Sequence, residues 1–269
     1  MLTVAYDGTG YHGWQAQKNA PTIEGELNRA LSELTRENVV VIGASRTDAG
    51  VHALGNVAVF DSETPIPAEK IAFAINRCLP EDIRVVASEE VAPDFHPRHV
   101  ECRKTYEYHI LNAPIALPTM RLYHHFTHIR LDVEKMNEAA QYLVGEHDFT
   151  SFCAVGAVVE SKVRTIFEAS VTSGGRMWTS APTADIIASA PAVGAVVNRP
   201  FHTNITITLT GNAFLYHMVR IIAGTLMEVG AGRYPPEAVA GIIAARDRCA
   251  AGPTAPAHGL TLAKISYIC

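Results

Sequence analysis

GASRTDAGVHALG, residues 43–55, joins two apolar runs, VVVIGAS (39–45) and NVAVFDS (56–62). Both runs are rich in β-branched residues and have turn-forming residues at their ends, which is typical of strands. The connection is too long for a tight hairpin turn, and it carries Arg46 and Asp48 among three glycines. We therefore expect two core strands joined by a glycine-hinged loop that presents two charged side chains.

The first hundred residues around this loop alternate between strand and helix patterns. Residues 2–7 and 83–91 have the composition of strands, whereas residues 22–38 and 67–79 have the pattern of amphipathic helices. Thr22 is the expected N-cap of the first helix, because its hydroxyl can accept a bond from a first-turn amide. Together with the two strands around the loop, the order is βαββαβ, a ferredoxin-like unit.

The second half of the chain has the same order of patterns without detectable sequence identity to the first half. Strand patterns occupy residues 103–111, 162–173, 202–211 and 259–268, and helical patterns occupy residues 132–145, 213–230 and 235–247. We therefore expect an α+β fold of two similar ferredoxin-like or RRM-like βαββαβ halves, residues 1–100 and 101–269, with mostly antiparallel sheets and helices on one face. Residues 173–199, biased to Ala, Pro, Ser and Gly, are expected to be an inserted loop.

Composition limits the class of protein further. The chain is 48% hydrophobic and 18% charged, which is typical of a globular protein with a sizeable core. No signal-peptide pattern is evident at residues 1–10, and the most apolar helical stretch, 217–230, is too short to span a bilayer. Five scattered cysteines without a CxxC pair favour reduced thiols over a zinc site or a disulfide framework. We expect a cytoplasmic protein without a membrane partner.

Asp48 is the first candidate functional residue. The small residues Ala49 and Gly50 leave its carboxylate accessible, and Arg46 is close enough in the chain to pair with it. Such a pair would hold the carboxylate ionised, as a nucleophile or a general base requires. The alternative is a turn aspartate that bonds its own backbone, which is common in D-x-G turns. The apolar flanking strands and the nearby arginine favour the functional interpretation.

Arg220 and Tyr106 are two further candidates. Arg220 has apolar neighbours on a helix, and an arginine buried in such surroundings needs an anionic partner, for which Asp48 is the candidate. The alternative for Arg220 is a side chain that extends to the helix surface. Tyr106 shares one face of its strand with Tyr108, a pattern of core packing that also suits a ring stacked on an extruded base.

Positive charge is concentrated in residues 95–130 although the net charge of the chain is −5. This segment holds five Lys or Arg and six His against two acidic residues. A basic segment interleaved with aromatic residues favours binding to nucleic-acid phosphates, and the alternative is a solvated charged face. The spacing of His124, His125 and His128 matches no established metal signature, so we expect no metal site.

Seven stretches in chain order resemble the successive motifs of the tRNA pseudouridine synthase A (TruA) family. They are AYDGTGYHGWQAQ (5–17), SRTDAGVHALGNVAVF (45–60), LPEDIRV (79–85), FHPRHVECRKTYEYHI (95–110), GEHDFTSF (145–152), FLYHMVRIIAGTLMEVG (214–230) and APAHGLTL (255–262). The resemblance spans essentially the whole chain, and RTDAGVHA is its most specific part. It implies the pseudouridine synthase fold, a homodimer, and isomerisation of uridines 38, 39 and 40 in the tRNA anticodon arm without a cofactor.

The same resemblance implies roles for single residues of this chain. Asp48 is similar to the catalytic aspartate of the family, and Arg220 to the arginine that pairs with it. Tyr106 resembles the tyrosine that stacks on the target base, and Arg46 the arginine that enters the RNA as the base leaves the stack. Further substrate-binding residues are expected at His96, Arg98 and Leu260.

Two departures and two rival functions stand beside this interpretation. Asn56 occupies a position where the family usually has glutamine, and Pro97 replaces a small residue; neither belongs to the catalytic set. A non-catalytic RNA-binding protein would use the basic segments and would not need Asp48. An aspartyl hydrolase built on T-D-A-G would need a second loop of this kind, which the second half of the sequence lacks.

Overall fold

The structure is a computed structural model, and it describes residues 1–156, 159–174 and 203–268. The elements of the first half are β1 (Leu2–Tyr6), α1 (Ile23–Thr35), β2 (Ile42–Gly43), β3 (His52–Val59), α2 (Ala68–Ile75) and β4 (Ile83–Ser88). The expected order βαββαβ is confirmed. Thr22 caps α1 as expected, because its hydroxyl accepts a bond from the Gly25 amide.

The elements of the second half include the same order, with further short elements between them. They are β5 (Cys102–Asn112), β6 (His125–Thr127), α3 (Val133–Gln141), β7 (Gly145–Asp148), β8 (Val163–Gly174), β9 (Thr203–Gly211), α5 (Met218–Gly230), α6 (Ala238–Ala245) and β10 (Leu260–Tyr267). The shared order is β5-α3-β8-β9-α5-β10. Short 3₁₀ turns include η1 (Pro118–Met120), η2 (Thr150–Phe152), η3 (Arg248–Ala250) and η4 (Ala257–Gly259). The short strands β6 and β7 were not predicted. Most of the predicted loop 173–199 lies outside the described residues.

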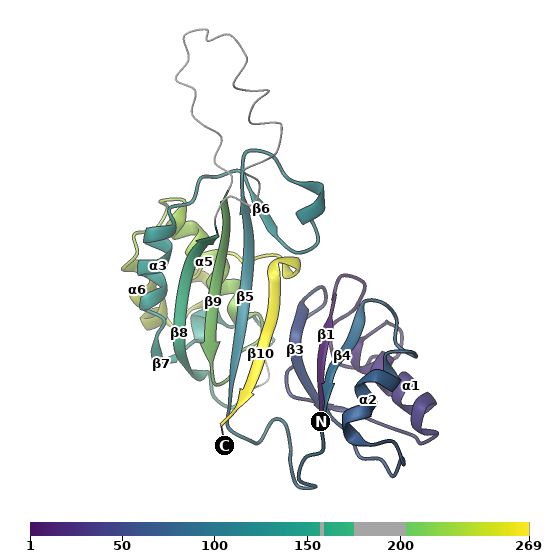
Figure 1. The fold of residues 1–269 in the computed structure, drawn as a ribbon. Helices are drawn as coiled ribbons and strands as arrows, with labels where there is room; N and C mark the ends of the chain where they lie inside the picture. The colour runs from purple at the N-terminus through teal and green to yellow at the C-terminus, as the bar shows by residue number, and fades with distance from the viewer. Residues whose placement is uncertain (157–158, 175–202, 269) are drawn as a thin grey trace, which may run out of the picture.

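One mixed sheet of ten strands connects the described parts of both halves (Figure 1). Its order is β4-β1-β3-β10-β5-β9-β8-β7, with β2 beside β3 and β6 beside β5. Among the described strands, only the β3–β10 and β5–β6 pairs are parallel. The protein is therefore α+β with a large, mostly antiparallel sheet. The first half has the strand order β4-β1-β3-β2, and the second half has the equivalent order β10-β5-β9-β8.

The halves join at the beginning of β3, directly after the Asp48 loop. Here β10 pairs with β3 through Thr261 opposite His52. The buried His52 ring accepts a bond from the Gly8 amide at Nδ1 (3.1 Å), and its Nε2 lies 3.0 and 3.2 Å from the carbonyl oxygens of Leu122 and His258. One histidine thus links segments of both halves.

The loop around Asp48 is shorter than the sequence predicts. The expected strand 39–45 is reduced to β2, and the expected strand 56–62 begins instead at His52, so the connection runs over residues 44–51. The reduction of the first strand has a reason in contacts with α1. The amides of Val39 and Val41 donate to the side chains of Ser32 and Asn28 on that helix, and these bonds replace a strand ladder.

Helix α5 also begins later than predicted, at Met218 instead of residue 213. His217, immediately before it, has the left-handed conformation with φ 59° and ψ 8°, which ends the helical path in that direction. The helix packs on β5 and on α3, while α2 packs on β4 and α3 on β8. Among the described residues, no helix has the length and apolar character needed to cross a membrane.

We predict that Gly224→Ala lowers the free energy of unfolding by about 1–3 kcal/mol, the usual cost of overpacking. Gly224 on α5 faces Pro253, whose carbonyl oxygen would overlap an added Cβ. Gly241→Ala on α6 is the matched control, because an added Cβ there meets no atom within 4 Å and a helical Gly→Ala change stabilises by about 0.5–1 kcal/mol. Urea unfolding measures both; a Gly224→Ala protein as stable as wild type would contradict this packing.

Candidate active site

The loop that carries Asp48 is fixed on both sides of that residue. The carbonyl oxygen of Thr47 accepts a bond from the Trp14 amide (3.0 Å), and the Thr47 hydroxyl bonds the buried Tyr6 hydroxyl (2.8 Å). After Asp48 the chain turns at Gly50, which has φ +77°, and the Val51 amide bonds the Asp48 carbonyl oxygen (3.1 Å). Contacts with buried residues therefore hold Asp48 in place, although its own side chain is 23% exposed.

The Asp48 carboxylate meets Arg220 of α5. Arg220 Nη1 donates to Asp48 Oδ2 at 3.1 Å, so the expected contact between these two residues is present. Arg220 is itself anchored, because its Nε donates to the Ala255 carbonyl oxygen (2.8 Å) and its own carbonyl oxygen accepts from the Ala255 amide (3.0 Å). Its side chain is 15% exposed, so it does not extend to the helix surface.

Arg46 does not pair with Asp48. Its side chain is exposed and makes no hydrogen bond or ion pair with any described residue. The prediction of an Arg46–Asp48 pair from closeness in sequence is therefore wrong, because Arg220 supplies the cation from another element. The Arg46 guanidinium is therefore available to a ligand that binds beside the loop.

Tyr106 of β5 lies beneath the same loop. Its hydroxyl bonds the Ser45 hydroxyl at 2.9 Å, and its ring meets the Phe214 ring edge-on with centroids 5.1 Å apart. Burial, together with the Asp48 charge, raises the pKa of Tyr106 to about 12, although the Ser45 bond lowers it in part. The phenol is therefore protonated at neutral pH. Only 6% of the residue is exposed, which leaves little of the ring open to a ligand in this form.

Asn56, the departure noted in the sequence, supports the loop from β3. It is fully buried, and its Nδ2 donates to the Ser45 carbonyl oxygen (3.0 Å) and to the Tyr6 hydroxyl (3.2 Å). These bonds hold both the backbone of Ser45 and the tyrosine that bonds Thr47. Asn56 therefore fixes the path of the loop without touching Asp48.

His217 is a residue of the site that the sequence analysis missed. Its Nε2 lies 3.4 Å from Asp48 Oδ2, the oxygen that Arg220 also contacts. Burial lowers the pKa of His217, the charges of Arg220 and Arg248 lower it further, and the Asp48 charge opposes them. The imidazole is therefore neutral at neutral pH. The available signal was its position three residues before Arg220, a spacing that places two side chains on one helical face.

Lys104 was also missed, and it connects the basic segment to the loop. Its Nζ donates to the Ala44 carbonyl oxygen at 2.9 Å, from the same face of β5 as Tyr106. Burial lowers the pKa of Lys104, and the charge of Arg98 lowers it further.

The remaining predicted substrate-binding residues make no hydrogen bond or ion pair with Asp48 in the part of the chain that the structure describes. The His96 ring stacks on His99 with centroids 3.9 Å apart, and Arg98 is exposed. Leu260 is buried at the start of β10, in register with Tyr108. Within the described residues, neither His96 nor Arg98 bonds any member of the Asp48 site. The structure thus gathers Asp48, Arg220 and Tyr106 and leaves these residues outside their contacts.

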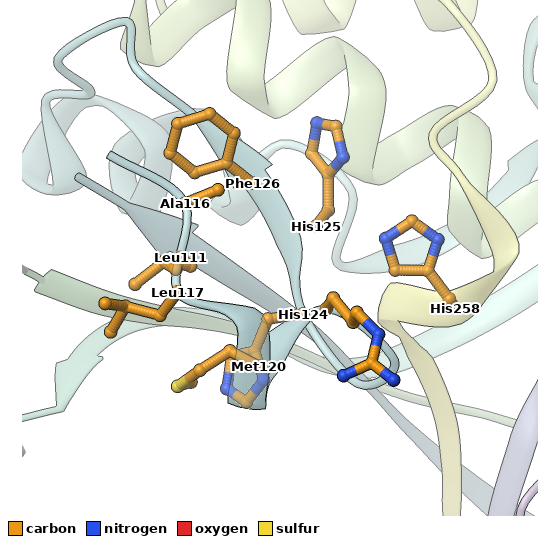
Figure 2. Close-up of a pocket in the computed structure, with 9 residues that line it drawn as sticks. Leu111, Ala116, Leu117, Met120, His124, His125, Phe126 and His258 are labelled. Atoms are coloured by element: carbon orange, nitrogen blue, oxygen red, sulfur yellow. The ribbon is translucent and has the colours of Figure 1, made fainter. Parts of the chain in front are cut away.

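Two surface hollows are lined by residues other than Asp48. One, of about 240 Å³, has Leu111, Leu117 and Phe126 on one side and His125 and His258 on the other (Figure 2). The second, of about 450 Å³, lies between the halves and is lined in part by Asp7, His52 and His109. The described residues contain no group of three or more His, Cys, Asp or Glu side chains that could hold a metal ion.

Comparison with known proteins gives one consistent result. A family model described as tRNA pseudouridine synthase matches residues 2–99 and 139–268. The chain is 44% identical to tRNA pseudouridine synthase A of Thermoanaerobacter sp. (strain X514), and the match covers 99% of the chain and 98% of that relative. It is 45% identical to the protein of that name from Ruminiclostridium cellulolyticum (99% and 98% covered) and 43% identical to that from Brevibacillus brevis (98% and 97% covered).

We predict that Tyr106→Phe makes the stability of the protein less sensitive to alkaline pH. The folded-state pKa of Tyr106 is about 12 against about 10 for an unfolded chain, so its stabilisation is complete below pH 10 and is lost as the pH rises towards 12. The loss amounts to about 1–3 kcal/mol for this one group. Tyr6 and Tyr108, whose pKa values burial also raises, remain in the variant and preserve part of the dependence.

Urea unfolding at pH 7, 9.5 and 11 measures this effect. At pH 7 the variant should already be about 1 kcal/mol less stable, because the buried Ser45 hydroxyl loses its partner. The difference in free energy of unfolding between wild type and variant should then be smaller at pH 11, because only the wild type loses stability through Tyr106. Parallel curves for wild type and variant would mean that Tyr106 titrates like an exposed tyrosine.

Proposed function

This chain belongs to the TruA family of tRNA pseudouridine synthases, which are isomerases, and we propose that it converts uridines 38, 39 and 40 of the tRNA anticodon arm to pseudouridine. The observation that carries the proposal is the contact between Asp48 and Arg220, which presents a paired carboxylate beside the buried Tyr106. The reaction detaches uracil from C1′ of the ribose and rejoins it through C5. It is redox-neutral, and the proposal includes no cofactor.

Asp48 is the proposed reacting group, by one of two routes. Its carboxylate attacks C1′, and the electron pair of the C1′–N1 bond leaves on N1 of uracil. Alternatively, it takes a proton from the sugar, which becomes unsaturated as the uracil anion leaves and regains the proton later. In both routes the uracil then turns and C5 bonds to C1′; in the first route the bond between C1′ and the Asp48 oxygen breaks in this step and the carboxylate is regenerated. The C5 proton then departs and N1 takes up a proton. Arg220 orients the carboxylate in a partly covered site, where such contacts are strong.

Tyr106 is proposed to contact the detached uracil. Its pKa of about 12 argues against a phenolate that removes the C5 proton at neutral pH. Because its ring is largely covered by neighbours that include Phe214, stacking on a base requires a small rearrangement there when RNA binds.

Arg46 is proposed to occupy the space that the extruded uridine leaves. Its exposure and its lack of a partner among the described residues support this role over that of a clamp on Asp48. Extrusion costs roughly a few kcal/mol of unstacking, and a guanidinium inserted into the stack offsets part of that cost.

The wider assignments have separate support. Lys104, which bonds the Ala44 carbonyl oxygen at one end of the loop, and the exposed Arg98 support a path for the RNA backbone across the basic segment. The shared strand order supports two similar ferredoxin-like halves, residues 1–100 and 101–269. Four described cysteines are unpaired, in keeping with action in the cytoplasm. A homodimer with RNA lying across both subunits is supported by the family resemblance alone.

We predict that the protein releases tritium from tRNA labelled at uridine C5 and that Asp48→Asn abolishes this release. The affinity for tRNA should stay within about tenfold of wild type, because phosphate contacts supply most of the binding energy. Asp61→Asn, at an exposed aspartate, is the matched control. A few per cent of wild-type rate in the Asp48 variant would remove this residue from the chemistry. Full tRNA binding by a wild-type protein without release would favour a non-catalytic RNA-binding protein.

We also predict that Arg46→Ala slows the reaction more for a paired uridine than for an unpaired one. A side chain that replaces the extruded base in the stack contributes most where the uridine is hardest to unpair. The rate loss caused by Arg46→Ala should therefore be larger on the paired substrate by about 1–3 kcal/mol, or roughly tenfold to a hundredfold. Single-turnover rates on tRNAs with uridine 39 paired or mismatched measure this, with exposed Arg77→Ala as control. Equal losses on both substrates would assign Arg46 to Asp48 instead of to the RNA.

A further inference from the structure

Two side-chain nitrogens lie close to a single oxygen of Asp48, and one of them, Arg220 Nη1, donates a hydrogen bond to it. Arg220 Nη1 lies 3.1 Å from Oδ2, and His217 Nε2 lies 3.4 Å from the same atom. No described residue donates a hydrogen bond to Oδ1. A carboxylate held at Oδ2 by one donor can still turn about its Cβ–Cγ bond, whereas a second polar group close to the same oxygen restricts that turn. The arrangement therefore distinguishes two oxygens that are chemically equivalent in an unbound aspartate.

The backbone of His217 is unusual in a way that helix capping does not explain. Among the described residues, only Arg36, His217 and Arg246 have positive φ without being glycine. Arg36 and Arg246 are C-caps of α1 and α6, where the left-handed conformation is common. His217 stands instead at the N-terminus of α5, and its side chain makes no capping bond. This conformation is unfavourable for a residue with a side chain, and in it the imidazole Nε2 lies 3.4 Å from Asp48 Oδ2.

We propose that His217 is a positioning residue that, with Arg220, holds Oδ2 of Asp48 and so leaves Oδ1 as the oxygen that reacts with the nucleotide. The inference rests on the proposed function, because it assigns an orientation to the carboxylate of that site. Its value to the reaction is geometric, since a reacting group displaced by about 1 Å can lose on the order of a hundredfold in rate.

The surroundings of His217 suit a neutral donor. Asp48 faces it from the loop before β3, Arg220 from its own helix and Arg248 from η3, while the Tyr216 ring lies against it with centroids 3.9 Å apart. Partial burial and the two cations lower the pKa of the imidazole and keep it uncharged. At 3.4 Å from Oδ2, a neutral Nε2–H needs only a small shift to donate to this oxygen, and it adds no second full charge beside the carboxylate. The neutral ring thus complements the arginine instead of duplicating it.

Three variants of His217 separate positioning from a structural role. His217→Asn tolerates positive φ but ends too near its own backbone to reach Asp48, whereas the longer His217→Gln places an amide donor near the position of Nε2. His217→Gly removes the backbone strain and the donor together. Each is compared with wild type by single-turnover tritium release, tRNA affinity and thermal unfolding.

We expect the Asn and Gly variants to lose about tenfold to a hundredfold in single-turnover rate. Their tRNA affinity should stay within about twofold, the Gly variant should melt at or above the wild-type temperature, and Gln should recover most of the rate. Rates within twofold of wild type in Asn and Gly, or no recovery in Gln, would overturn the inference. Absence of release by wild type would instead contradict the proposed function, so the two failures are distinguishable.

Discussion

Asp48 and Arg220 are 172 positions apart in the chain, yet their side chains meet at 3.1 Å where the two halves of the sheet join. Neither charge is well hydrated, and a charge left alone in such surroundings would be costly. The pair therefore fixes how α5 lies against the loop before β3. Ala255 extends the constraint to the segment before β10, because it bonds both the side chain and the backbone of Arg220.

The site is composite because each half supplies a different kind of component. The first half provides the carboxylate on a loop held by Trp14 and Asn56. The second half provides the groups that surround it, Tyr106 from β5 and both Oδ2 neighbours from the beginning of α5. Their relative placement depends on the pairing of β3 with β10 and on the bonds that His52 makes to both halves.

Local periodicity was enough to predict most helices and strands, and burial of an arginine was enough to predict its aspartate partner. The errors arose where tertiary contacts override local preference. Val39 and Val41 have the side chains of a strand, but their amides donate to side chains of α1. His217 lies within a helical sequence pattern, but its backbone has the left-handed conformation and the helix begins one residue later. The predicted Arg46–Asp48 pair is wrong for the same reason, because closeness in sequence does not reveal that Arg220 on α5 supplies the cation. The contact of Phe214 with the Tyr106 ring likewise depends on a segment far away in the sequence, between β9 and α5.

The place of β10 in the sheet has a consequence for how the chain is made. This strand is translated after every other described strand, yet it lies between β3 and β5, near the middle of the order. Until it emerges from the ribosome, the facing edges of β3 and β5 have no partner at this seam, and such edges are prone to pair with other chains. The newly made protein therefore passes through a stage in which the first half has all of its strands, the second half still lacks β10, and the edges of β3 and β5 remain open to aggregation.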